Sequence, residues 1–167
     1  MKFFSLIITI SFGIFFSSLH AQPLCETLTN NSWKGEGKLM GMNAEFQMDW
    51  TLALDEKFMH LDFHNKMMIP DREPMIFKAQ AYYRIANDSI VDGQWFDSRG
   101  YILPLKGTIS DNELVIYWGD EKSPESGKTT YTSLENGSIK TVDYISNESG
   151  YGQFGEAIYQ KHAKGED

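Results

Sequence analysis

The stretch that decides the fold is Phe46–Phe63, which reads FQMDWTLALDEKFMHLDF. Apolar and polar residues alternate from Phe46 through Met48 and Trp50, and they alternate again after the turn residues 55–57, DEK. This period of two residues is that of a β-strand with one buried face. The stretch therefore predicts two antiparallel strands joined by a tight turn.

The same pattern continues on both sides of this hairpin. A strand opens at Trp33, and Asn136-Gly137 is a strong signal for a tight hairpin turn. The remaining expected strands cover residues 77–85, 89–96, 101–110, 113–118, 129–134, 139–145 and 153–160. About ten strands in short succession describe a meander, and closing it removes its exposed edges. The sequence predicts an all-β, antiparallel up-and-down β-barrel with a short N-terminal helix in 24–31; a two-sheet sandwich is the alternative.

The first residues have the features of an export signal. Met1-Lys2 is a short basic start, residues 3–16 are almost entirely apolar, and Ala21 is a small residue at a cleavage position. An uncleaved membrane anchor is the alternative, although the apolar run is short for a full span. We expect a signal peptide at 1–21, an N-terminal segment at 22–32, a barrel at 33–162 and a tail at 163–167. The expected location is outside the cytoplasm, in the periplasm or the medium, with no transmembrane span after cleavage.

Composition excludes two classes of protein. The chain is 41% hydrophobic and 14% aromatic, which is too apolar for a disordered protein. Its formal net charge of -8 supplies no basic surface for nucleic acid. Cys25 is the only cysteine, so no internal disulfide can form, and we expect Cys25 to act as a small apolar residue.

Two short motifs resemble those of a known group of barrels. The segment Trp33-Lys34-Gly35-Glu36-Gly37 resembles the opening strand of the calycins, the lipocalins and their relatives, which carries Gly-x-Trp; Asn31 stands in place of that glycine. The closest likeness is to uncharacterised secreted bacterial lipocalin-like domains, whose mid-chain hairpin is similar to Gly93–Gly100. The resemblance implies a lipocalin-like barrel. Trp33 would then plug the closed end, and Gly35 and Gly37 would let the opening strand bend.

A barrel of this size either fills its interior with side chains or keeps a cavity for one small ligand. Apolar faces that point inward would suit a hydrophobic or aromatic ligand. The candidate ligand-binding residues are Phe46, Met48, Trp50, Leu61, Phe63, Phe77, Tyr83, Trp95, Tyr117 and Tyr144. The loop Ile69–Pro74, which contains two prolines, is a candidate for part of the mouth.

Histidines raise the alternative of a metal or haem protein. His60 and His64 lie near methionine-rich stretches that could suit copper, but residues four apart on a strand are about 13 Å apart and cannot chelate one ion together. The opening strand is also similar to that of nitrobindin-like haem barrels, Gly-x-Trp-x-Gly-x-Gly-x-Gly: Trp33, Gly35 and Gly37 match, and Asn31 and Leu39 stand where that pattern has glycine. In those barrels a late histidine holds the iron. His162 is the late candidate here. No cofactor is predicted, and haem stays an alternative.

Catalytic signals are few. The sequence has no nucleophile elbow, phosphate-binding glycine loop or zinc-protease motif. Asp49, Asp92, Asp97 and Glu156 could act as acids or bases only if they were buried. We therefore expect an exported binding protein that holds a small hydrophobic or aromatic molecule and is not an enzyme. The alternatives are a haem- or metal-binding barrel and a ligand-free interaction module of the cell envelope.

Overall fold

The computed structural model describes residues 23–29, 31–86 and 89–162. These residues form one short helix, α1 (Pro23–Leu28), and ten strands. The strands are β1 (Asn31–Leu39), β2 (Met42–Ala53), β3 (Phe58–Met67), β4 (Met75–Ile85), β5 (Ile90–Asp97), β6 (Ile102–Ile109), β7 (Glu113–Trp118), β8 (Gly127–Ser133), β9 (Ile139–Asn147) and β10 (Gly150–His162). Among the residues described, no helix is long and apolar enough to cross a membrane. The predicted signal peptide and C-terminal tail lie outside the described residues.

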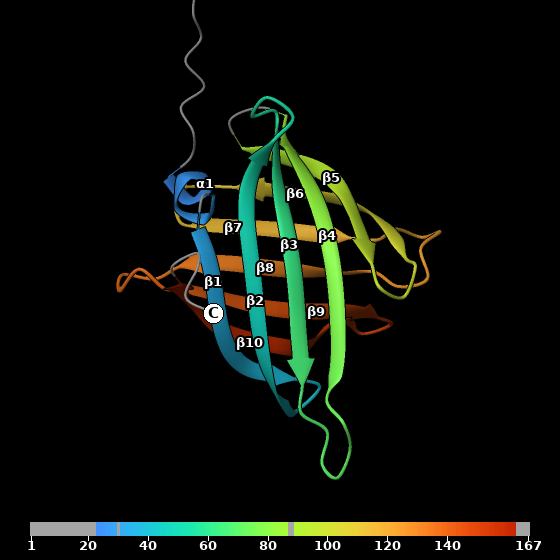
Figure 1. The fold of residues 1–167 in the computed structure, drawn as a ribbon. Helices are drawn as coiled ribbons and strands as arrows, with labels where there is room; N and C mark the ends of the chain where they lie inside the picture. The colour runs from blue at the N-terminus through green and yellow to red at the C-terminus, as the bar shows by residue number, and fades with distance from the viewer. Residues whose placement is uncertain (1–22, 30, 87–88, 163–167) are drawn as a thin grey trace, which may run out of the picture.

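The strands close into one antiparallel barrel. Each strand pairs with the next in the chain, and β1 completes the circle by pairing with β10. In Figure 1, β2, β3 and β4 form the front wall, and β7 to β10 cross behind them. The predicted up-and-down barrel is confirmed, and the alternative sandwich is wrong because the sheet has no break between two halves.

Helix α1 covers one end of the barrel. Leu24 and Leu28 are fully buried and pack in the same core as Trp33, which is also fully buried. The indole N–H of Trp33 donates a hydrogen bond to the carbonyl of Leu28 at 3.3 Å. Cys25 is buried as well, with its Sγ 3.0 Å from the Sδ of Met59. We call this end, where α1 packs, the closed end.

Two glycines of β1 allow β10 to come close. A Cβ at Gly37 would lie 1.9 Å from the carbonyl oxygen of Glu156, which is far inside contact distance. A Cβ at Gly35 would lie 2.8 Å from the ring of Tyr159. Any side chain here would push the two strands apart, so these glycines permit the contact that closes the barrel.

Candidate functional site

The barrel interior holds a cavity of about 400 Å³. Its rim comes from the connections opposite α1: Met40 in the β1–β2 turn, Arg99 in the β5–β6 turn and Glu125 before β8. Met75, the first residue of β4, also lies on the rim, so the loop 69–74 is at the open end, as expected (Figure 1). The interior is therefore closed by α1 at one end and accessible at the other.

Aromatic rings form one wall of the cavity. Phe63 of β3 packs against two of them, with its ring centroid 6.3 Å from that of Phe77 and 6.1 Å from that of Trp95. Phe77 and Trp95 are stacked at 6.3 Å with an interplanar angle of 21°. Phe46 of β2 extends the wall, 6.5 Å from Phe63. These flat apolar faces suit an aromatic ligand.

Most of the predicted ligand-binding residues point into the barrel, where some line the cavity and others lie in the packed core beside it. Those that line the cavity are Phe46, Met48, Phe63, Phe77, Tyr83 and Trp95. Trp50 and Leu61 are fully buried in the core and are not among the lining residues. The Trp50 ring packs against Tyr83 at 5.4 Å and Tyr131 at 5.7 Å. Trp50 and Leu61 thus belong to the packed part of the interior.

The predicted inward orientation of Tyr117 and Tyr144 is wrong. Tyr117 is 45% exposed and packs against Tyr151 on the outer surface. The ammonium of Lys128 lies 4.8 Å from the centre of the Tyr144 ring. Both strands have apolar residues on each face, so alternation alone does not identify the buried face. The inward residues of these strands are Leu114, Ile116 and Trp118 in β7 and Ile139, Thr141, Asp143 and Ile145 in β9.

A half-buried acid lies halfway along β9, and the sequence analysis missed it. Asp143 lines the cavity and accepts a hydrogen bond from the Thr129 hydroxyl at 2.7 Å. The same hydroxyl accepts one from the Trp118 indole at 3.3 Å. The register of β10 shifts between Gln153 and Gly155, and a Cβ at Gly155 would lie 2.8 Å from Oδ2 of Asp143. The absence of a side chain at Gly155 therefore makes room for the carboxyl.

Three tyrosines of the cavity lining interact electrostatically with this carboxyl. Tyr83, Tyr131 and Tyr159 come from β4, β8 and β10, and all are buried on the cavity lining. Tyr83 and Tyr131 are hydrogen-bonded to each other. Burial raises the pKa of all three phenols, and the nearby charge of Asp143 raises each further. The tyrosines thus stay neutral and offer hydroxyl groups to the interior.

The carboxyl of Asp143 itself is destabilised as an anion. Burial raises its pKa above the ordinary value of 3.8, and the Thr129 hydrogen bond only partly opposes this. The groups that face it, Tyr83, Tyr131 and Tyr159, carry no positive charge. When the pKa of an acid is raised in the folded protein, its protonated form favours folding. This contribution to stability is complete at pH values below the pKa of the unfolded chain, and it is lost as the pH rises through the pKa of the folded protein.

We therefore expect Asp143→Asn to stabilise the protein at about pH 7.5, by on the order of 1 kcal/mol. At about pH 3 the gain should vanish because the wild-type carboxyl is then protonated in both states. Urea unfolding followed by tryptophan fluorescence at the two pH values measures this. Asp62→Asn, on the outer face of β3, serves as control and should change little. A loss of stability in Asp143→Asn at neutral pH would contradict the reasoning.

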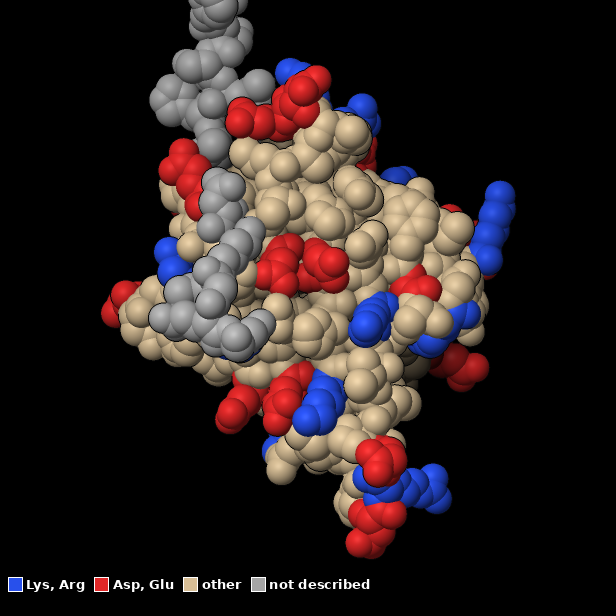
Figure 2. Space-filling model, in the orientation of Figure 1, with Lys and Arg blue, Asp and Glu red and all other residues tan. Residues whose placement is uncertain are grey.

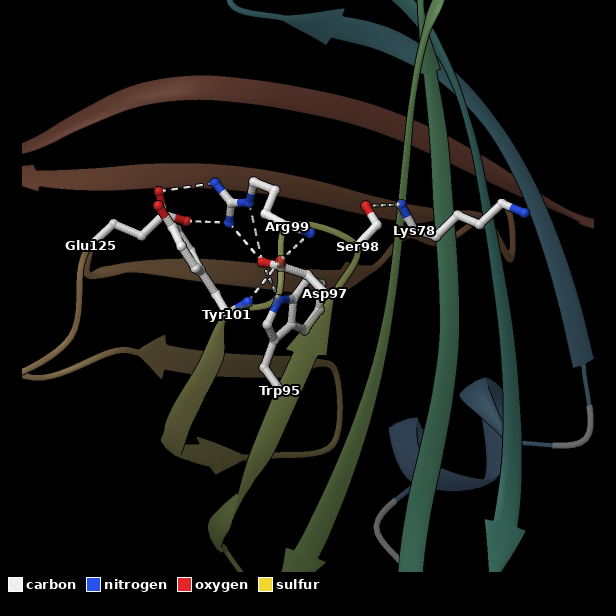
Figure 3. Close-up of polar contacts among 7 residues, drawn as sticks. All are labelled: Lys78, Trp95, Asp97, Ser98, Arg99, Tyr101 and Glu125. Atoms are coloured by element: carbon white, nitrogen blue, oxygen red, sulfur yellow. Dashed lines mark hydrogen bonds and ion pairs between the residues drawn. The ribbon is translucent and has the colours of Figure 1, made fainter.

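An ion cluster at the rim ties two connections together (Figure 3). The guanidinium of Arg99 bonds Asp97 at 2.7 Å and Glu125 at 2.5 Å, and so joins the β5–β6 turn to the β7–β8 connection. The Asp97 side chain is fully buried and accepts further bonds from the backbone N–H groups of Arg99 and Tyr101 and from the Trp95 indole. Burial acts to raise the pKa of Asp97, but the hydrogen bonds from Arg99 and Tyr101 hold that pKa below its ordinary value.

The flat guanidinium of Arg99 also packs against aromatic rings at the open end of the barrel. Its Cζ lies 4.5 Å from the centre of the Tyr101 ring and 5.2 Å from that of Phe77. The same guanidinium therefore holds two carboxylates and covers the outer edge of the aromatic wall. The pKa of Arg99 is raised, chiefly by its hydrogen bond to Glu125.

The candidate metal and haem residues are not brought together. His60 and His64 are on the outer face of β3, where the His60 ring lies 4.6 Å from that of Tyr82, whereas Met67 of the same strand is buried inside. His162 ends β10 opposite Ser32 of β1, at the closed end. The described part of the chain holds no group of three or more acidic, histidine or cysteine side chains placed for a metal. A haem held by His162 does not fit this cavity, because no histidine is among its described lining residues.

The carboxylates considered for acid–base chemistry are mostly engaged on the outside. Asp92 pairs with Arg84 and Glu156 with Lys140, all at the surface. Asp49 accepts hydrogen bonds from Ser32 and Gln47. Figure 2 shows acidic side chains over the middle of the face formed by β2 and β3, where Asp49 lies opposite Asp62 in the register.

Comparison with known proteins supports the fold. No protein-family model matches the chain, and no curated protein matches it in sequence. Among solved structures, Rv2717c from M. tuberculosis matches with a TM-score of 0.63 over 86% of this chain and 98% of that chain. The two sequences are 11% identical, so the likeness is one of fold.

Proposed function

We propose that this chain is a lipocalin-like binding barrel, which holds a small hydrophobic or aromatic molecule without transforming it. The observation that carries the proposal is the cavity of about 400 Å³, open at one end and walled by Phe63, Phe77 and Trp95. Its volume lies in the range of pockets for small organic ligands. Burial of ligand surface against this wall would supply the affinity, and the tyrosine hydroxyls would orient polar groups.

Binding fits the lining better than catalysis does. Asp143 is the acid in the middle of the cavity, and its neighbours are hydroxyl groups and aromatic rings. The described lining residues include no histidine, cysteine or lysine that could serve as its base or nucleophile partner. The neutral phenols and the carboxyl can orient a ligand through hydrogen bonds, which supports a binding role.

The proposed setting is outside the cytoplasm. It rests on the sequence of residues 1–21, with its basic start, apolar run and Ala21. A carrier in that setting would take up its ligand at the open end, between Met40, Met75 and Arg99.

A titration with N-phenyl-1-naphthylamine, an uncharged fluorescent aromatic compound, tests the proposal. We expect one saturable site and a blue-shifted, enhanced emission, because the probe leaves water for an apolar cavity. Phe63→Ala removes the central ring of the wall and should weaken binding by about tenfold. Phe96→Ala is the matched control, since Phe96 is 41% exposed on the outside of β5 and should leave binding unchanged.

Two results would overturn the proposal. Equal weakening in Phe63→Ala and Phe96→Ala would place the probe on the surface. The absence of any saturable binding to the wild-type protein would favour a filled interior and the alternative of a ligand-free interaction module.

A further inference from the structure

The cavity presents hydrogen-bond acceptors that the protein itself leaves open. Asp143 receives one hydrogen bond from the described residues, from Thr129 to Oδ1, while Oδ2 lies over Gly155. Asn65 of β3 is 5% exposed and also lines the cavity, and its buried Oδ1 has no hydrogen-bond partner among the described residues. The buried Oδ1 of Asn65 is costly without a partner, so a ligand that donates to it would relieve that cost, and Oδ2 of Asp143 offers a further acceptor to the cavity.

Within the described part of the chain, Asp143 forms no ion pair with a basic side chain. Arg99 is the cation among the described lining residues, and its guanidinium is already held by Asp97 and Glu125 at the rim. The side chains beside Asp143 are the phenols of Tyr83, Tyr131 and Tyr159, the Thr129 hydroxyl and the Trp118 indole. An ionised Asp143 would therefore have to be balanced from outside the protein.

The aromatic wall suits the ring of such a ligand. Flat apolar rings pack well against one another. Phe63, Phe77 and Trp95 line one part of the cavity. The cavity thus contains both a carboxylate and aromatic rings, and it has room for the apolar part of a ligand.

We propose that the ligand is a protonated aromatic amine, whose ammonium group pairs with Asp143 and whose ring packs against Phe63, Phe77 and Trp95. This inference rests on the proposed function and names its ligand class. Asn65, on a strand separated from β9 by β2, β1 and β10 in the barrel order, would accept a hydrogen bond from a second donor on the ligand.

A matched pair of compounds tests the inference. 1-Naphthylmethylamine is a cation at about pH 7.5, and 1-naphthylmethanol has nearly the same shape without the charge. Isothermal titration of the wild-type protein should show the amine bound at least about tenfold more tightly than the alcohol. In Asp143→Asn this preference should disappear, whereas the affinity for the alcohol should stay within about threefold of the wild-type value.

Asp62→Asn, which removes a carboxylate from the outer face, is the matched control and should keep the full preference for the amine. Equal affinities for the two compounds in the wild-type protein would overturn the inference and leave the proposed function standing. A preference that survives in Asp143→Asn would also overturn it, by placing the cation elsewhere. If neither compound binds and N-phenyl-1-naphthylamine does not bind either, the proposed function itself fails.

Discussion

Replacing Trp50 with alanine is expected to destabilise the fold by about 4 kcal/mol. Trp50 is fully buried and packs against Tyr83 and Tyr131 in the core between α1 and the cavity. Removing so large a side chain leaves a hole that the rigid barrel wall cannot fill by small shifts. Urea unfolding monitored by circular dichroism measures the loss.

Trp95→Ala is the matched substitution on the cavity wall. Its ring is half-buried and already borders empty space, so we expect a loss below about 2 kcal/mol together with weaker binding of N-phenyl-1-naphthylamine. Similar stabilities of the two alanine variants would mean that the closed end is not more tightly packed than the cavity wall, contrary to the structure.

Arg99→Ala is expected to cost about 2 kcal/mol and to loosen the mouth. Its removal leaves Asp97 as a buried carboxylate without its ion pair and separates the β5–β6 turn from Glu125. A fully buried pair would cost more, but Arg99 is 42% exposed and water can replace part of the interaction. Urea unfolding gives the free energy, and hydrogen exchange at Gly100 and Tyr101 reports the rim.

The control is Arg84→Ala, which breaks the ion pair with Asp92 on the outer surface. Both side chains of that pair are well exposed, so the variant should unfold almost as the wild-type protein does. If Arg99→Ala cost no more than Arg84→Ala, the rim cluster would be an ordinary surface contact.

Much of the fold could be predicted because period-two alternation is strong in this chain. Phe46 to Phe63 fixes one hairpin and the buried face of both its strands, and the turn signals Asn136-Gly137 and Ser98-Arg99-Gly100 fix others. Closure followed from the number of strands and the cost of free edges. The position of α1 over the barrel end could not be predicted, because a six-residue helix is too short for its sequence to indicate which surface it packs against.

The candidate site could be predicted only in part, since a ligand site depends on which face of each strand points inward. The sequence of β9 allows either Val142 and Tyr144 or Thr141 and Asp143 to face inward, and the more apolar pair lies outside. Ile139 and Ile145 share a face with Asp143, and this was the signal that could have found it. The register shift in β10 that sets Gly155 beside Asp143 has no equally clear mark in the sequence.

Native mass spectrometry of the protein, purified gently from cells that express it and measured beside a denatured sample, shows whether the barrel holds a ligand. We expect a mass excess of one small organic molecule that disappears on denaturation, or one bound N-phenyl-1-naphthylamine when that probe is supplied. The mass of the bare polypeptide in every sample, with and without the probe, would contradict a binding barrel.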